Sequence, residues 1–339
     1  MRLVRHKRNH NSPERTARAV VDERRLLNES NTIMRRILFV FLDGVGLGPS
    51  HAHNPLAATD LPSFAHLAHG QSWTADLASV TTPHRTIRSL DAVLGVDGLP
   101  QSGTGQATLF TGVDCIRMAG RHFGPFPHSA THTVLDADNL FHQIHALGNG
   151  TTPATAFANA YPPLFFERAA SRGRWPTTTR CCRAASVRLR TLDDLQSGDA
   201  LAADLTGDGL RTHLDLPVER RRPRDAGTHL AALHRRHAFT LFEYFHTDKM
   251  GHGRLDESPV HLLGQLDAFF AALLDTLDPA ADTLLVTSDH GNLEALHRKT
   301  HTRHPVPLLV YGWAAPFFSE ATDLTDVTPS IVRALQSEV

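Results

Sequence analysis

The sequence has 339 residues, of which 41% are hydrophobic and 20% charged, and a formal net charge of -1. A near-neutral chain gives no reason to expect nucleic acid or an anionic membrane as its main partner. No run approaches the roughly 18 apolar residues of a membrane span, and no signal peptide opens the chain, so we expect a cytoplasmic protein. The length allows one large α/β domain or two smaller ones.

Residues 1–36 carry ten Lys or Arg and four Asp or Glu with little apolar periodicity. This composition predicts a disordered or loosely helical basic extension. Met34 lies directly before the first apolar run, so the natural start could equally lie there. The domain proper is expected at 37–339.

Short apolar runs alternate with helical patterns from residue 37 onward. The runs are ILFVFL (37–42), TPATAFANA (152–160), FTLFEYF (239–245), TLLVTS (283–288) and PLLVYG (307–312). Such runs are typical of strands covered on both faces, and patterns such as HLLGQLDAFFAALLDTL between them predict helices. We therefore expect an α/β fold with a doubly wound, mainly parallel sheet and helices on both faces.

Residues 162–236 follow a less regular pattern that is rich in arginine. Arginines occur at 168, 172, 174, 180 and 183, and a further cluster spans 220–224. A solvated surface explains most of them, and a collar that attracts an anionic substrate is the functional alternative. We expect this segment on the substrate side of the domain.

Asp43 lies directly after the first predicted strand, in FLDGVGLG. The glycines permit a sharp turn close to a ligand, but their spacing does not fit the Gly-x-Gly-x-x-Gly of dinucleotide-binding proteins. An aspartate at this position is either a helix cap or a ligand. Taken alone, such an aspartate is more often a helix cap than a ligand, and it gains weight only because the loops at the carboxyl ends of strands form the site in open α/β sheets.

The stretch QSGTGQATLFTG (101–112) predicts a helix that begins near Ser102. Free backbone N–H groups at such a helix terminus can hold an anion. A serine hydroxyl needs a base or a metal to become a nucleophile, and a plain helix cap is the alternative. Thr104 is a second candidate nucleophile in the same turn.

Three further stretches place acids and histidines near strand ends. Asp248 and His252 are four residues apart after the 239–245 run, a spacing at which two side chains can share one ion on a helical turn. Asp289 and His290 follow the 283–288 run, and His301 precedes the 307–312 run. His246 and His304 are lesser candidates, since the chain has 23 histidines and a single one is weak support.

Together these stretches supply three aspartates, three histidines and one serine. Oxygen and nitrogen donors without a thiolate suit Zn²⁺ or Mn²⁺. Seven ligands exceed what one tetrahedral ion needs and suit two divalent ions. The three cysteines, Cys115, Cys181 and Cys182, are expected to be free thiols.

The sequence resembles the alkaline phosphatase superfamily in five motifs that occur in the family's order: Asp43, Ser102, DKMGH, SDHGN and HTRHPVP. The similarity covers nearly all of 37–312 and is greatest to the metalloenzyme core of cofactor-independent phosphoglycerate mutases and phosphopentomutases. It implies that Ser102 is a nucleophile that attacks a phosphoryl group beside two ions about 4 Å apart. It also implies two ligand sets: Asp43, Ser102, Asp289 and His290 for one ion, and Asp248, His252 and His301 for the other.

Two departures from these mutases bear on the reaction. Only the residues from Met118 to Leu135 follow the nucleophile helix before the next core element, which leaves little room for their large cap domain. The mutases carry a lysine beyond the following strand, whereas this chain reads Asn159-Ala160-Tyr161. A cap excludes water, so its absence favours hydrolysis of a small phosphorylated metabolite over intramolecular transfer.

Two other functions remain open at this point. One is a mutase that uses residues 162–236 as its lid, and the other is a metal-binding protein without turnover. Arg121 and His122, in AGRHFGPFP, are candidate substrate contacts or plain surface residues. The oligomeric state is not predicted.

Overall fold

The computed structural model describes residues 34–148 and 154–338, and the fold below refers to these residues. From Arg35 onward the chain forms one compact unit. The predicted basic extension therefore lies almost wholly outside the described residues.

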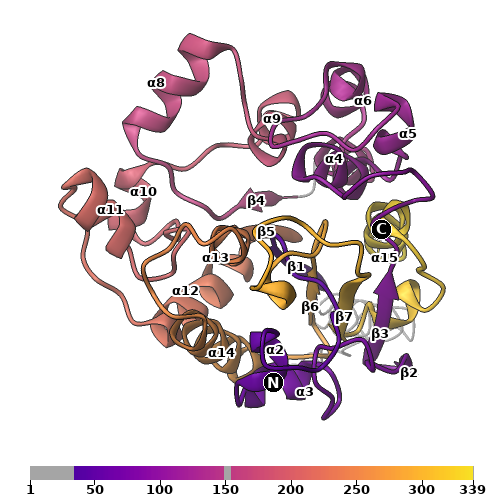
Figure 1. Cartoon of the computed structure of the whole chain (residues 1–339). Helices are drawn as coiled ribbons and strands as arrows, with labels where there is room; N and C mark the ends of the chain where they lie inside the picture. The colour runs from indigo at the N-terminus through magenta and orange to yellow at the C-terminus, as the bar shows by residue number, and fades with distance from the viewer. Residues whose placement is uncertain (1–33, 149–153, 339) are drawn as a thin grey trace, which may run out of the picture. The chain divides into compact units, whose positions relative to one another are not determined.

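A seven-stranded sheet forms the centre of the unit, in the order β2-β3-β7-β6-β1-β5-β4 (Figure 1). The strands are β1 (Arg36–Leu42), β2 (Val80–Thr82), β3 (Arg85–Leu90), β4 (Thr155–Phe157), β5 (Phe239–Tyr244), β6 (Asp282–Thr287) and β7 (Val306–Gly312). Each of the five predicted strand runs overlaps one of these strands. The predicted α/β class is therefore correct.

The sheet is mixed: one part is parallel, as expected from the sequence, and the side formed by β7, β3 and β2 is antiparallel. β4, β5, β1 and β6 are parallel neighbours, whereas β7 runs antiparallel to β6 and β3 runs antiparallel to β7. Apolar runs indicate burial on both faces but carry no information on strand direction. β2 and β3 were not predicted because their sequence, VTTPHRTIRSL, is polar and joined by a tight turn.

The two faces of the sheet carry separate hydrophobic cores. The side chains of Ile37, Phe39 and Phe41 enter one core, and those of Leu38, Val40 and Leu42 enter the other, because successive strand residues point to opposite faces. All six are at most 1% exposed, and burial of such a side chain contributes about 1.5–3 kcal/mol. β1 is thus fixed in register on both sides.

Helices cover both faces (Figure 1). The Phe39 face packs against α4 (Ser102–Thr111), α5 (Cys115–Ala119), α6 (His132–Ala137), α7 (Leu140–His145), α9 (Thr177–Ala184), η3 (Ala315–Phe318), η4 (Leu324–Asp326) and α15 (Val327–Gln336). The Val40 face packs against α2 (Pro55–Ala58), α3 (Pro62–Leu67), α12 (Pro223–His234), α13 (His246–Gly251), α14 (Pro259–Thr276) and η2 (Leu293–Ala295). The three cysteines are free and buried, as expected.

The arginine-rich segment that was predicted to be irregular contains several short helices. They are α8 (Pro163–Arg172), α9, α10 (Leu192–Ser197), α11 (Asp208–Leu214) and α12. A further short helix, η1 (Ser129–Thr131), precedes the segment. Ala160, Ala200 and Val218 belong to a small third core beside the main sheet. The segment is therefore ordered partly around its own apolar contacts and partly through α9 and α12, which pack in the two main cores.

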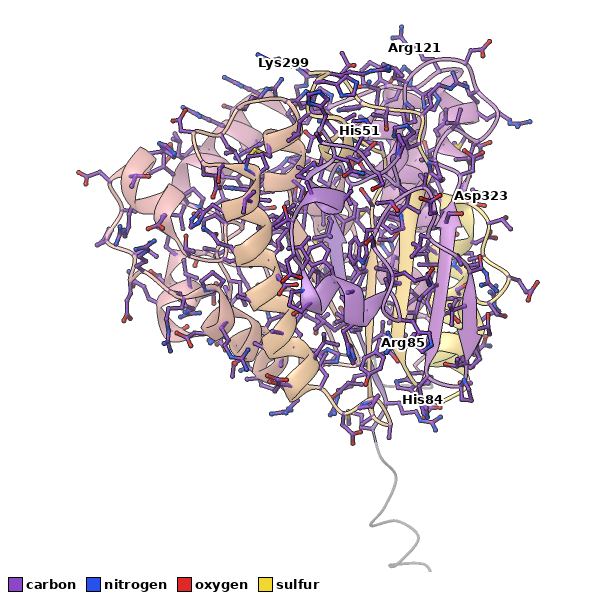
Figure 2. The ribbon with its side chains drawn as sticks, turned by 60° about the horizontal axis from the view of Figure 1, so that its bottom comes forward. His51, His84, Arg85, Arg121, Lys299 and Asp323 are labelled. Carbon is purple, nitrogen blue, oxygen red and sulfur yellow. The ribbon has the colours of Figure 1, made fainter. Side chains whose placement is uncertain are left out.

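Local sequence signals set the ends of the helices that matter most below. α4 ends at Gly112, whose φ of 74° is left-handed and suits glycine. α14 begins after Ser258, whose hydroxyl accepts the His261 amide, with Pro259 in its first turn. In Figure 2 the hairpin residues His84 and Arg85 lie at one end of the strands, and Lys299, between β6 and β7, lies toward the other.

Candidate metal and phosphoryl-transfer site

All seven predicted donors lie at one edge of the sheet. Asp43 follows β1, Asp248 and His252 lie in or just after α13, which follows β5, and Asp289 and His290 follow β6. His301 precedes its strand instead of following one. Because β7 is antiparallel to β6, its beginning lies at the edge where the parallel strands end, and His301 joins the others there.

Four of the donors form one group, in which Ser102, Asp43 and Asp289 surround the Nε2 atom of His290. Nε2 lies 2.9 Å from Ser102 Oγ, 3.4 Å from Asp43 Oδ1 and 3.6 Å from Asp289 Oδ2. His290 and Asp289 are completely buried. Residues from three separate parts of the chain therefore converge at one point.

The remaining three donors form a second, adjacent group. His252 Nε2 and His301 Nε2 lie 3.1 Å apart, and each lies 3.4 Å from Asp248 Oδ1. The His301 ring stacks on the His290 ring with centroids 3.8 Å apart, which joins the two groups. Ligand atoms of Asp248, His290 and His301 also lie within 4.8 Å of one another.

Backbone carbonyls orient the two histidines of the second group. His252 Nδ1 lies 3.0 Å from Lys299 O, and His301 Nδ1 lies 2.7 Å from Pro100 O. A carbonyl oxygen can only accept, so Nδ1 carries the proton and a neutral ring presents a lone pair at Nε2. Two such lone pairs 3.1 Å apart beside a carboxylate fit a shared cation.

The first group also fits a cation, because most of its carboxylate oxygens lack a hydrogen-bond partner among the described residues. Asp43 Oδ1 and both carboxylate oxygens of Asp289 are buried without a hydrogen bond among the described residues. Burial, followed by repulsion from Asp289, raises the pKa of Asp43, and burial, followed by Asp248, raises the pKa of Asp289 to about 8. A divalent ion would supply the missing partner and favour both ionised forms.

Ser102 is the first residue of α4, and Thr104 points elsewhere. The Thr104 hydroxyl accepts from the Phe123 amide at 3.1 Å, and the Thr104 amide donates to Phe123 O at 2.9 Å. The backbone amides at this helix terminus were expected to be free to bind an anion, but the Thr104 amide is already hydrogen-bonded. A Cβ at Gly103 would lie 2.0 Å from Phe126 O, so the 123–126 loop packs closely on the turn that presents Ser102.

Polar residues that the sequence analysis did not single out hold the donors in place. Gln106 Nε2 donates to Asp43 Oδ2 at 3.3 Å, and Asn292 Nδ2 donates to Asp248 Oδ1 at 2.7 Å. The Thr247 hydroxyl donates to the Asp43 carbonyl at 2.6 Å. Gln106 and Asn292 lie inside the motifs QSGTGQ and SDHGN, and this position was the sequence feature from which their role could have been predicted.

Glu294 connects three of the loops that carry donors. Its Oε2 accepts the amides of Gly46 and Asn292, each at 2.9 Å, and its Oε1 accepts from the Thr302 hydroxyl and from His304 Nδ1. Burial acts to raise the pKa of Glu294, but these hydrogen bonds hold it below its ordinary value. His304 therefore supports the site from outside the donor groups.

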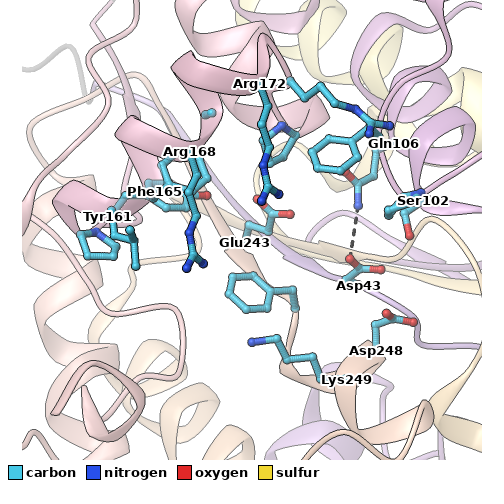
Figure 3. A pocket seen from close by; sticks show the side chains of 18 of the residues that line it. Asp43, Ser102, Gln106, Tyr161, Phe165, Arg168, Arg172, Glu243, Asp248 and Lys249 are labelled. Atoms are coloured by element: carbon cyan, nitrogen blue, oxygen red, sulfur yellow. Dashed lines mark hydrogen bonds between the residues drawn. The ribbon is translucent and has the colours of Figure 1, made fainter. Parts of the chain in front are cut away.

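A cavity of about 640 Å³ opens in front of the donors (Figure 3). Asp43, Ser102 and Asp248 line it together with Arg168, Arg172 and Arg174 of the predicted arginine collar. Other arginines of the segment form contacts of their own: Arg180 pairs with Asp136, Arg220 with Asp208, Arg222 with Asp225 and Arg224 with Asp275. The collar is thus limited to the first three.

The two candidate substrate contacts at 121 and 122 lie outside the lining of this cavity. Arg121 is exposed at the outside of the molecule, with its guanidinium 5.4 Å from the Phe123 ring (Figure 2). His122 Nε2 lies 3.1 Å from Val96 O. Both residues therefore have local structural contacts, and the residues of this loop that line the cavity are Pro125 and Phe126.

Comparison with known proteins agrees with this architecture. The model of the Metalloenzyme superfamily matches residues 218–339. The 2,3-bisphosphoglycerate-independent phosphoglycerate mutase of Acaryochloris marina is 31% identical over 123 residues, which cover 32% of this chain and 23% of the mutase. The corresponding mutase of Pseudomonas fluorescens is 29% identical over 109 residues, covering 30% and 21%. These matches span less than a quarter of the relatives' length.

Two solved structures share the fold. A Pyrococcus horikoshii protein, PH0037, has a TM-score of 0.53 at 12% identity, covering 91% of this chain and 99% of its own. The alkaline phosphatase of the Antarctic bacterium TAB5 has a TM-score of 0.51 at 11% identity, covering 89% and 98%. The protein thus has an α/β fold that these two structures share. The family model, the relatives and the fold together support a core like that of the alkaline phosphatase superfamily.

No helix in the described residues is long and apolar enough to cross a membrane.

Proposed function

We propose that this protein is a phosphoryl-transfer enzyme that uses two divalent metal ions, Mn²⁺ or Zn²⁺, and hydrolyses a small phosphorylated metabolite. The observation that carries the proposal is the position of Ser102 Oγ, 2.9 Å from His290 Nε2 and at the wall of a cavity that Asp43 and Asp248 also line. The proposed ligands are Asp43, Ser102, Asp289 and His290 for one ion, and Asp248, His252 and His301 for the other.

Ions held by these residues would favour the ionised Ser102 hydroxyl and offset charge on the phosphoryl oxygens. Ser102 Oγ would attack the phosphorus in line, so that a bond from Oγ to phosphorus forms as the bond to the leaving alcohol breaks. The alcohol takes a proton, and water then cleaves phospho-Ser102 to serine and inorganic phosphate. Gln106 and Asn292 would hold the donor carboxylates throughout.

A Ser102→Ala variant tests the proposal. With an aryl phosphate and Mn²⁺ or Zn²⁺, we expect its rate to fall at least about 1,000-fold, as for loss of a nucleophile. Ser129→Ala, which removes an exposed serine of η1, is the matched control. Equal rates for wild type and Ser102→Ala would show that Ser102 is not the nucleophile.

A phosphomutase is the second candidate. Its support is the similarity to phosphoglycerate mutases together with α8, which supplies Arg168 and Arg172 to the cavity wall and could serve as a lid. Isomerised phosphoglycerate or sugar phosphate without free phosphate would favour it. Two bound metal equivalents without activity on a panel of phosphate and sulfate esters would instead indicate a metal-binding protein that lacks turnover.

A further inference from the structure

The cavity extends well beyond the donor groups. Its volume of about 640 Å³ lies in the range that encloses drug-sized ligands. In Figure 3, Ser102 lies on one side of the cavity, whereas Tyr161, Phe165 and Arg168 lie on the other. A phosphate at Ser102 would therefore leave most of the space for the rest of the substrate.

Aromatic and aliphatic side chains form much of the wall. Phe165 stacks on Tyr161 with ring centroids 4.0 Å apart and an interplanar angle of 24°. Phe126, Phe245 and Leu164 also line the cavity. Such a wall suits an apolar or aromatic body in the substrate, because each buried apolar Å² contributes about 25 cal/mol.

Cationic side chains lie among these rings. Arg168 and Arg172 reach into the cavity from α8, and Lys249 reaches into it from α13 (Figure 3). Lys249 Nζ lies 4.4 Å from the Phe245 ring centroid. Within 34–148 and 154–338, Arg168 and Arg172 form no ion pair, so their donors are available to a ligand.

Besides the proposed metal ligands Asp43 and Asp248, the acid Glu243 lines the cavity and would oppose an anionic ligand if it were charged. Its side chain is 6% exposed, and burial raises its pKa to about 7. Its charge is therefore only partial near neutral pH, and the cations outnumber it.

These features define a substrate class, which rests on the function proposed above. We propose that the substrate is a phosphomonoester with an apolar or aromatic body and a second anionic group, which Arg168 and Arg172 bind together with Lys249. The second group is a carboxylate or another phosphate. Charge-assisted hydrogen bonds from arginine suit both.

Binding of non-hydrolysable phosphonates to the Mn²⁺-loaded protein, measured by calorimetry, tests this inference without turnover. The ligands are benzylphosphonate, 4-carboxybenzylphosphonate and 1,4-bis(phosphonomethyl)benzene. We expect at least one of the two ligands with a second anion to bind about 10-fold more tightly than benzylphosphonate, and the tighter of the two identifies the group. Phosphonoacetate, which has both charges but no ring, should bind at least about 10-fold more weakly than 4-carboxybenzylphosphonate.

The double variant Arg168→Ala/Arg172→Ala should lose the preference for a second anion. Both residues are exposed on α8, so their truncation leaves the core unchanged. Arg222→Ala, at an exposed arginine paired with Asp225, should keep the preference. Equal affinities for all three benzyl ligands in wild type, or a preference that survives in the double variant, would overturn the inference. Loss of esterase activity alone would bear only on the proposed function.

Discussion

The carboxylate of Glu294 occupies the space where a side chain at Gly46 would lie. Its Oε2 accepts the Gly46 amide at 2.9 Å, and a Cβ at Gly46 would lie 2.4 Å from its Oε1. The same carboxylate would lie 2.3 Å from a Cβ at Gly291. Gly46, near Asp43, and Gly291, next to His290, are thus required because Glu294 approaches both of them closely. Glu294 contacts both loops that carry these donors.

Replacing Gly46 with alanine should therefore destabilise the protein. We expect Gly46→Ala to cost about 1–3 kcal/mol of unfolding free energy and to lower Mn²⁺ affinity, because Glu294 must move. Gly264→Ala is the matched control, since a Cβ there meets nothing within 4 Å and alanine favours α14 by up to about 1 kcal/mol. Urea denaturation measures the unfolding free energy of both variants. A Gly46→Ala protein as stable as wild type, with unchanged Mn²⁺ affinity, would contradict this account.

His252 should be needed for full metal loading. Its Nε2 faces His301 and Asp248, so His252→Ala removes one donor and should weaken one metal site at least about 10-fold. Elemental analysis after dialysis would show the loss. His261→Ala, which changes an exposed histidine of α14, should retain wild-type metal content. A loss of the same size in both variants would argue against a specific role for His252.

Much of the site could be predicted because parallel strands end at a common edge. Asp43, Asp248 and Asp289 each follow a recognisable apolar strand, so their convergence follows from the fold class. His301 was expected because it lies shortly before the 307–312 run, and the antiparallel β7 supplies the physical reason why it joins the other donors.

Other features could not be read from the sequence because they depend on tertiary contacts. Glu294 resembles an ordinary charged residue, yet it is 1% exposed and forms four hydrogen bonds across distant loops. Arg168 and Arg172 could not be separated from Arg180 until the path of α8 was known. Arg121 was singled out because it lies close in sequence to α4, but the residues of its loop that line the cavity are Pro125 and Phe126.

Removal of metal should lower thermal stability. Within the part of the chain that the structure describes, Asp43 Oδ1 and both carboxylate oxygens of Asp289 are buried without a hydrogen bond, and a bound ion contributes about 2.7 kcal/mol at 100 times its Kd. For a domain of this size we expect EDTA to lower Tm by about 5–10 °C, and Mn²⁺ or Zn²⁺ to restore it. Calorimetry measures the shift. An unchanged Tm after verified metal removal would contradict a buried ion at this position.

Acid should weaken the contact between the beginnings of β1 and β6. Asp282 is 2% exposed, and Arg36 Nε donates to it at 2.8 Å. Burial acts to raise its pKa, but hydrogen bonds from His234 and Arg36 lower the pKa to about 2. A folded-state pKa below the unfolded value of about 3.9 stabilises the protein above that value, by about 1–2 kcal/mol, and the effect is lost as pH falls through 2.

Asp282→Asn should accordingly be less stable than wild type at pH 7, and the difference should shrink by about half at pH 3. Urea denaturation at the two pH values measures it. Asp275→Asn, at an exposed residue paired with Arg224, is the control and should show little difference at either pH. A stability difference for Asp282→Asn that is the same at pH 7 and pH 3 would contradict the assigned ion pair.

Anomalous diffraction from crystals grown with Mn²⁺ tests the arrangement of the site most directly. We expect two peaks about 4 Å apart, one bonded to Ser102 Oγ, Asp43, Asp289 and His290, and the other to Asp248, His252 and His301. A single peak remote from Ser102, or no peak at either group, would contradict the proposal that two ions flank the serine hydroxyl.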